Sequence, residues 1–143
     1  MIKKRKILIV IADYYSSISS SLLDSAKKTL IKPFKLRVIT VPGVFEIPVI
    51  ISKNIKKFDA FIALGCVIKG ETPHFDFISK ASIEAIMNLS VKNKKPIGNG
   101  IITCLNMKQA IARKNNKGEE AANAVNSVFD ELELDNKDML VDF

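Results

Sequence analysis

The sequence predicts an α/β fold in which a four-stranded parallel sheet lies between two layers of helices, a three-layer αβα sandwich. Two observations support this prediction. Four short runs are continuously apolar rather than alternating, which is typical of strands covered on both faces. Each run is followed by a segment with apolar residues at helical spacing, long enough to cross over the sheet. The 143 residues, 48% of them hydrophobic, are expected to form a single domain.

The expected strands are runs of six to nine mainly apolar residues. In chain order they are residues 7–12, 36–41, 60–68 and 96–103. The first run reads ILIVIA and the third reads AFIALGCVI, so both predict strands buried in the middle of the protein. Pro42 and Gly43 follow the second run and break it.

The expected helices carry apolar residues three and four positions apart. In chain order they are residues 18–30, 45–57, 75–91, 107–113 and 118–132. Pro33 closes the first helix because proline cannot continue it, and Pro48 is tolerated only because it falls in the first turn of the second. Residues 115–117 are expected to form a turn between the last two helices, which gives the order βαβαβαβαα.

The net charge of +7 is unevenly distributed along the chain. The last 14 residues hold six acids and one base, so the first 129 residues carry +12. Only three Arg occur and 7% of the residues are aromatic, which is weak support for nucleic-acid recognition, and we expect no nucleic-acid partner. Residues 133–143 are expected to form a loosely ordered acidic tail.

Two sequence patterns that direct a protein to a membrane or out of the cell are missing, which predicts the compartment in which this protein functions. No apolar run reaches the roughly 18 residues that a membrane-spanning helix needs, and residues 1–6 lead directly into the first strand without the pattern of a signal peptide. We therefore expect a cytoplasmic protein with no membrane partner. Cys66 and Cys104 each lie in a strand-like run, which predicts buried free thiols in a reducing compartment. Neither they nor the single His form a metal-binding pattern, so no metal is expected.

Ligands of parallel α/β sheets bind beyond the carboxyl ends of the strands. In this chain those ends are followed by residues 13–15, 41–46, 69–74 and 103–106. The loop 70–74 (GETPH) precedes a helix, so its backbone N–H groups form a potential anion site to which Thr72 adds a hydroxyl. The alternative is that Thr72 only caps the helix. No glycine-rich nucleotide-binding motif is present.

His74 is the only His in the chain. Its type has an unperturbed pKa of about 6.5, close to neutrality. Because it lies in the same loop as the potential anion site, it is a candidate general acid or base, the alternative being an ordinary surface or core histidine.

Three other side chains could hold a planar ligand. Phe45 or Tyr14 could stack on a ring while Glu46 binds its polar edge, or Glu46 could simply favour the start of a helix. Arg113 is suited to bidentate phosphate binding, although it and Lys117 are by default surface cations.

Three motifs together resemble the lumazine synthase family. They are VPGVFEIP at 41–48, GCVIKGETPHFD at 65–76 and NKGEEAA at 116–122, with NGIIT and QAIAR between them, and the resemblance covers residues 7–132. It implies a flavodoxin-like fold, in agreement with the pattern of strands and helices. It also implies condensation of 5-amino-6-(D-ribitylamino)uracil with 3,4-dihydroxy-2-butanone 4-phosphate to 6,7-dimethyl-8-ribityllumazine, phosphate and water. This is the penultimate step of riboflavin biosynthesis, and it uses no cofactor or metal.

The resemblance implies a role for each matched residue. His74 matches the proton-transfer residue, Tyr14 takes the place of the aromatic residue that stacks on the pyrimidine, and Arg113 matches the guanidinium that binds the phosphate. The remaining implied substrate-binding residues are Val44, Phe45, Glu46, Val67, Ile68, Glu71, Thr72, Asn99, Lys117 and Glu120.

Three features depart from the family pattern. Asn99 stands where many members have a Phe that completes the pocket from a neighbouring subunit. The segment between Arg113 and Asn116 is shorter than in many members, and so is the arm before the first strand. Members form pentamers, some of which assemble into sixty-subunit shells with active sites between adjacent subunits. The short arm favours a homopentamer here.

Two other functions remain open. The archaeal type of riboflavin synthase is similar in fold and dismutates two lumazine molecules without a phosphate, which the GETPH loop and Arg113 disfavour. A flavin-binding or scaffolding module of the same fold would show no turnover.

Overall fold

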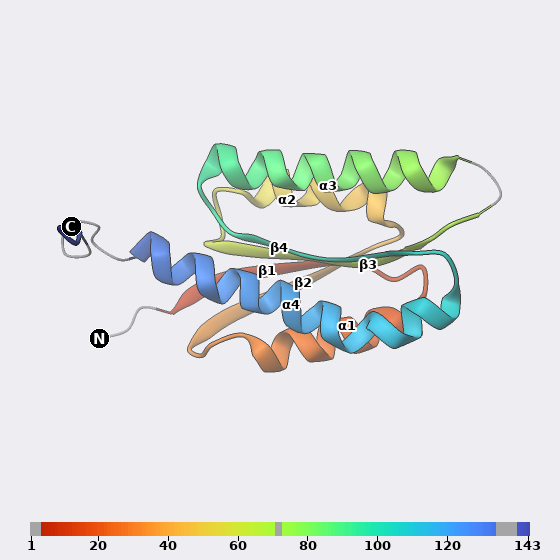
Figure 1. The fold of residues 1–143 in the computed structure, drawn as a ribbon, viewed down its shortest axis with the longest axis horizontal. Coiled ribbons are helices and arrows are strands. Elements are labelled where there is room, and N and C mark those ends of the chain that lie inside the picture. Colours follow the sequence, from red (N-terminus) through yellow and green to blue (C-terminus); the bar gives the residue numbers. More distant parts are fainter. Residues whose placement is uncertain (1–3, 71–72, 134–139) are drawn as a thin grey trace.

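The computed structural model describes residues 4–70, 73–133 and 140–143, and it confirms the predicted three-layer α/β fold. Four parallel strands form one sheet in the order β2-β1-β3-β4. The strands are β1 (Arg5–Ala12), β2 (Phe34–Val41), β3 (Ala60–Ile68) and β4 (Ile97–Cys104). Helices α1 (Ser16–Thr29) and α4 (Met107–Glu133) cover one face, and α2 (Ile47–Asn54) and α3 (His74–Asn93) cover the other (Figure 1). A 3₁₀ turn, Val44–Glu46, leads into α2.

The two central strands are buried, as their continuous apolar runs predict. β1 lies between β2 and β3, and β3 lies between β1 and β4, so both are covered on their edges and faces. β2 is an edge strand, and its residues Lys35, Arg37 and Thr40 are exposed. Charged side chains on an edge strand disfavour pairing with other chains.

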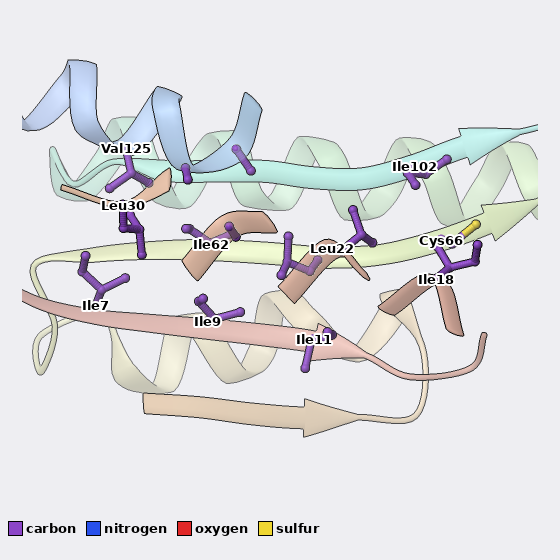
Figure 2. Packing of buried hydrophobic residues seen from close by; sticks show 14 of the residues in the cluster. Ile7, Ile9, Ile11, Ile18, Leu22, Leu30, Ile62, Cys66, Ile102 and Val125 are labelled. Atoms are coloured by element: carbon purple, nitrogen blue, oxygen red, sulfur yellow. The ribbon is translucent and has the colours of Figure 1, made fainter. Parts of the chain in front are cut away.

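The sheet packs against a separate core on each face. Ile62 of β3 contacts the core that includes Leu22 of α1 and Val125 of α4 (Figure 2). On the opposite face, Phe61 of β3 and Ile47 of α2 belong to the second core. Adjacent residues of β3 therefore face different layers, which is why the strand is apolar at every position.

Helix α4 corrects one expectation. The sequence predicted two helices separated by a turn at 115–117, but Met107–Glu133 is a single helix. Gly118, where the second helix was expected to begin, lies inside α4 where α1 packs against it. A Cβ atom at Gly118 would lie 2.5 Å from the carbonyl oxygen of Leu22. The glycine is therefore explained by the contact between the two helices and not by a helix end.

Replacing Gly118 by Ala is expected to lower the free energy of unfolding by about 1–3 kcal/mol, the usual cost of inserting a methyl group into a closely packed contact. The better helix propensity of Ala opposes this loss by about 1 kcal/mol, so the net loss is about 0–2 kcal/mol. Urea denaturation measures the difference. Gly70→Ala is the matched control, since a Cβ atom there would meet nothing within 4 Å. If Gly118→Ala were instead more stable than the wild type by about 1 kcal/mol, as helix propensity alone would make it, the close approach of α1 and α4 would be wrong.

Helix α4 also lies unusually close to the sheet. A Cβ atom at Gly98 of β4 would overlap the carbonyl oxygen of Ala121 in α4. No side chain separates the helix from the strand at this point, so the contact sets the height of α4 over β4. Arg113, Lys117 and Glu120, three of the predicted site residues, all lie on this helix.

The remaining differences lie at the ends of elements. Helix α2 ends at Asn54 rather than near Lys57, and α3 begins at His74 and continues to Asn93. The expected acidic tail begins with Glu133, the last residue of α4, and residues 134–139 of that tail lie outside the described residues. Among the helices that the structure describes, none has the length and apolar character needed to cross a membrane.

Candidate active site

Several of the residues predicted for the site lie at the carboxyl ends of the strands. This end of the sheet lies opposite the start of β1 and the end of α4 (Figure 1). Tyr14 follows β1, the 3₁₀ turn follows β2, and His74 is the first residue of α3. Glu71 and Thr72, predicted to bind phosphate, lie outside the described residues.

Two adjoining cavities collect most of the predicted residues, and we call them together the aromatic half-site. The larger, about 590 Å³, lies between the 3₁₀ turn and α3, with Phe45, Glu46 and His74 in its wall. The smaller, about 280 Å³, is lined by residues that include Tyr14, Val67 and Ile68. The residues that line both cavities are Gly43, Val44, His74 and Ile78. His74 therefore lies where the two cavities meet.

The aromatic half-site offers rings and a few polar groups. Tyr14 and Phe45 are 77% and 64% exposed, so their rings are open to a ligand. Glu46 is half-buried, and its N–H donates to the carbonyl oxygen of Gly43 at 3.2 Å, which fixes the 3₁₀ turn. Aromatic faces beside one carboxylate and one imidazole suit a planar ligand with polar edges.

A third cavity, about 390 Å³, lies between α4 and β4, and we call it the cationic half-site. Arg113, Lys117 and Glu120 face it from successive turns of α4. The Arg113 guanidinium Nη1 donates to the carbonyl oxygen of Thr103 at 3.4 Å, and Lys117 Nζ lies 3.8 Å from Glu120 Oε2. Two cations against one carboxylate leave a net positive charge, which suits a phosphate group. The unbroken helix keeps Arg113 and Lys117 one turn apart despite the shortened segment between them.

The structure does not bring all the predicted residues into one cavity. Among the described residues, none lines both the aromatic and the cationic half-site. Asn99 lies on β4, half-buried, and its Oδ1 accepts the N–H of Ile101 at 3.0 Å, so the side chain folds back onto its own strand. His74 and Arg113 therefore belong to separate concave surfaces of a single chain.

Several lining residues were not predicted from the sequence. Phe77, Ile78 and Ala81 extend the larger cavity along α3, and Ile101 and Ile102 line the cationic half-site. The α3 residues follow His74 at three, four and seven positions, a spacing that places them on one helix face. That spacing could have identified them once His74 was selected.

The two cysteines are free and buried, as predicted. Cys66 lines the smaller cavity, and burial, followed by the neighbouring Cys104, raises the pKa of its thiol to about 12. Cys66 therefore stays protonated near neutral pH and is a poor nucleophile. Within the described parts of the chain, no three His, Cys, Asp or Glu side chains gather as metal ligands would.

The raised pKa of Cys66 predicts how the stability of the protein depends on pH. Unfolding restores an ordinary cysteine, with a pKa of about 9, while the folded thiol ionises near 12. The folded state is therefore favoured fully below about pH 9, and this contribution is lost as the pH rises toward 12. The free energy of unfolding of the wild type should fall relative to that of Cys66→Ala over this range, since the titrating groups that do not contact Cys66 contribute equally to both. A constant difference would contradict the raised pKa.

Comparison with known proteins identifies the family. A family profile described as 6,7-dimethyl-8-ribityllumazine synthase matches residues 4–133. The enzyme of that name from Bartonella henselae is 46% identical over 131 residues, which cover 85% of this chain and 84% of the relative. That from Methylorubrum extorquens strain PA1 is 42% identical over 136 residues, covering 87% and 79%. Together with the fold, these matches show that the chain belongs to the 6,7-dimethyl-8-ribityllumazine synthase family, transferases of riboflavin biosynthesis.

Proposed function

We propose that this chain condenses 5-amino-6-(D-ribitylamino)uracil with 3,4-dihydroxy-2-butanone 4-phosphate, giving 6,7-dimethyl-8-ribityllumazine, phosphate and water. The observation that supports this most directly is the division of the candidate site into two parts of different chemistry. One part has exposed rings suited to a pyrimidine, and the other has a guanidinium and an ammonium suited to a phosphate. The reaction joins one substrate of each kind.

The aromatic half-site binds the pyrimidine substrate in this proposal. Tyr14 stacks on the ring, while Val44, Phe45 and Glu46 hold the ribityl chain and the uracil edge. Val67 and Ile68 form the wall at the end of β3. The exposure of the two rings supports this assignment, because a large exposed aromatic side chain gains most from covering by a ligand.

The cationic half-site binds the phosphorylated substrate. Arg113 supplies the bidentate contact and Lys117 a second positive charge, with Glu120 holding the lysine in place. The resemblance also assigns Glu71 and Thr72 to the phosphate. These two residues precede His74 in the sequence, whereas Arg113 and Lys117 line a different cavity. We therefore propose that one phosphate is held by residues of two different chains.

The site is therefore completed by a second copy of the chain. One subunit supplies the aromatic half-site, and its neighbour supplies Asn99 and the cationic half-site. Family membership supports small-molecule substrates and self-association in general. We propose a homopentamer, in which each subunit contributes a different surface to each of two neighbours, as closed rings require. If sedimentation showed a particle of sixty subunits, the assembly would be a shell and the proposed pentamer would be wrong.

The chemistry needs positioning more than a nucleophile. The amino group of the pyrimidine substrate attacks the carbonyl carbon itself, and phosphate loss and ring closure follow. Holding two reactants in register lowers a barrier by roughly 7–11 kcal/mol, whereas one proton-transfer group contributes about 10²- to 10⁴-fold in rate. His74 serves as the proton-transfer group, and the remaining side chains orient the substrates.

Incubation with the two substrates tests the reaction. Lumazine fluorescence should rise, and inorganic phosphate should appear in equal amount, only when both substrates are present. Conversion of added lumazine to riboflavin without a phosphorylated substrate would indicate the archaeal type of riboflavin synthase instead. Binding of a flavin without any turnover would indicate a carrier or scaffolding module.

Mixing two damaged variants tests the shared site. Subunits of His74→Ala and Arg113→Ala, dissociated and reassembled together, should form intact sites at about a quarter of their interfaces by random assortment. Each variant reassembled alone should recover none. Activity is measured with the phosphorylated substrate near the wild-type KM, where the raised KM of Arg113→Ala and the lowered kcat of His74→Ala both limit the rate. A mixture no more active than the mean of the two variants under this condition would rule out a site shared between chains.

A further inference from the structure

Tyr15 lies beside the ring that the proposed function uses for stacking. The Tyr14 and Tyr15 rings meet edge to face, with centroids 4.9 Å apart and planes at 77°. Tyr14 is 77% exposed, whereas Tyr15 is half-buried and packs against the core beneath α1. Tyr15 thus connects an exposed ring to the rigid interior.

Tyr15 is itself held firmly on both sides. Its carbonyl oxygen accepts the N–H of Ser19 at 3.0 Å. The buried Ser19 hydroxyl donates to the carbonyl oxygen of Ala12 at 2.6 Å, which ties the end of β1 to α1. The Tyr15 side chain lines the smaller cavity together with Cys66. The backbone that carries both tyrosines is therefore fixed from the last residue of β1 to the first turn of α1.

Burial also keeps the Tyr15 hydroxyl neutral. Loss of solvent, and then the neighbouring Tyr14, Cys66 and Cys104, raise the pKa of Tyr15 above its usual value of 10. Its ring accordingly presents an uncharged edge to Tyr14 at every pH at which the enzyme is expected to work.

We propose that Tyr15 is a positioning residue that holds the Tyr14 ring in the orientation on which the pyrimidine substrate stacks. The inference rests on the proposed function, since it requires Tyr14 to be the stacking ring. A free, exposed tyrosine would lose side-chain freedom on binding, and a ring already fixed by an aromatic partner avoids most of that loss. An edge-to-face pair of this kind is worth a factor of about 3 to 10 in binding.

Steady-state kinetics of three variants test the proposal. Tyr15→Leu keeps the apolar contact with the core but removes the ring, and it should raise KM for 5-amino-6-(D-ribitylamino)uracil about 3- to 10-fold. KM for 3,4-dihydroxy-2-butanone 4-phosphate should not change. Tyr15→Phe keeps the ring and should restore the wild-type KM. If Tyr15→Leu does not fold, as judged by circular dichroism, Tyr15→Met replaces it, because methionine fills irregular space without a ring.

A double-mutant cycle separates positioning from a merely structural role. In a Tyr14→Leu background, Tyr15→Leu should have no further effect on KM for the pyrimidine substrate, because the ring it positions is gone. An effect that persists in that background, an unchanged KM in Tyr15→Leu, or equal damage in Tyr15→Phe would each refute the role of Tyr15 while leaving the proposed reaction intact. A wild-type protein that forms no lumazine would refute the proposed function, and this inference with it.

Discussion

Replacing His74 by Ala is expected to lower kcat by about 100-fold or more while leaving a measurable residual rate. A positioned proton-transfer group is worth about 10²- to 10⁴-fold, and the larger contribution from orienting two substrates is untouched by this substitution. His74 lines both cavities of the aromatic half-site, so its imidazole lies beside the proposed position of the pyrimidine substrate. Single-turnover measurements of lumazine formation separate this chemical step from product release.

The control for His74 lies on the same helix. Lys80 of α3 is exposed and lines neither cavity of the aromatic half-site, so Lys80→Ala should keep the wild-type kcat. Substrate affinities of His74→Ala should stay close to those of the wild type, since the imidazole is assigned to proton transfer. A kcat for His74→Ala equal to that of the wild type at every pH would show that proton transfer does not depend on this residue.

Replacing Arg113 by Ala should raise KM for the phosphorylated substrate by about 10- to 100-fold, with a smaller effect on KM for the pyrimidine. Hydrogen bonds between charged groups contribute about 1.5–3 kcal/mol, which corresponds to this range. The guanidinium is already directed by the Thr103 carbonyl, so little freedom is lost when phosphate binds. Arg113→Lys should recover only part of the loss, because an ammonium lacks the planar pair of donors.

A second lysine on α4 provides the control for Arg113. Lys108 is exposed in the first turn of the helix and does not line the cationic half-site. Lys108→Ala removes the same charge without altering the predicted phosphate contact, so its KM values should match those of the wild type. Equal increases in both KM values for Arg113→Ala would show that the residue supports the whole site rather than the phosphate.

The sequence predicted the layers of the fold better than it predicted α4. Continuous apolar runs identify β1 and β3 because every side chain of a central parallel strand is buried. The prediction that a second helix begins at Gly118 was wrong, because the sequence does not distinguish a glycine at a helix end from a glycine where two helices cross. The distinguishing fact is the Leu22 carbonyl beside it, which is 96 positions away in the chain.

The sequence identified the residues of the candidate site that follow the strands, but not the helix residues that line its cavities. Tyr14, Phe45 and His74 were identified because they follow strands in chain order, and parallel strands all end at one edge. Phe77 was missed because helix α3 reaches the cavity only after folding. The resemblance implied active sites between adjacent subunits, but the residue pattern alone did not show that Arg113 and His74 line separate cavities, because this depends on how α3 and α4 pack on opposite faces of the sheet.

The close contact between Gly98 and Ala121 affects how mutational screens of this enzyme should be interpreted. Any side chain at position 98 must push α4 away from β4, and Arg113 and Lys117 move with the helix. A growth selection would therefore score position 98 as intolerant as the proposed phosphate-binding positions, although Gly98 lines none of the three cavities of the candidate site. Intolerance of substitution, taken alone, would misidentify Gly98 as a substrate contact, although it is needed for packing. Measuring protein abundance beside growth would separate the two, since a displaced helix lowers both.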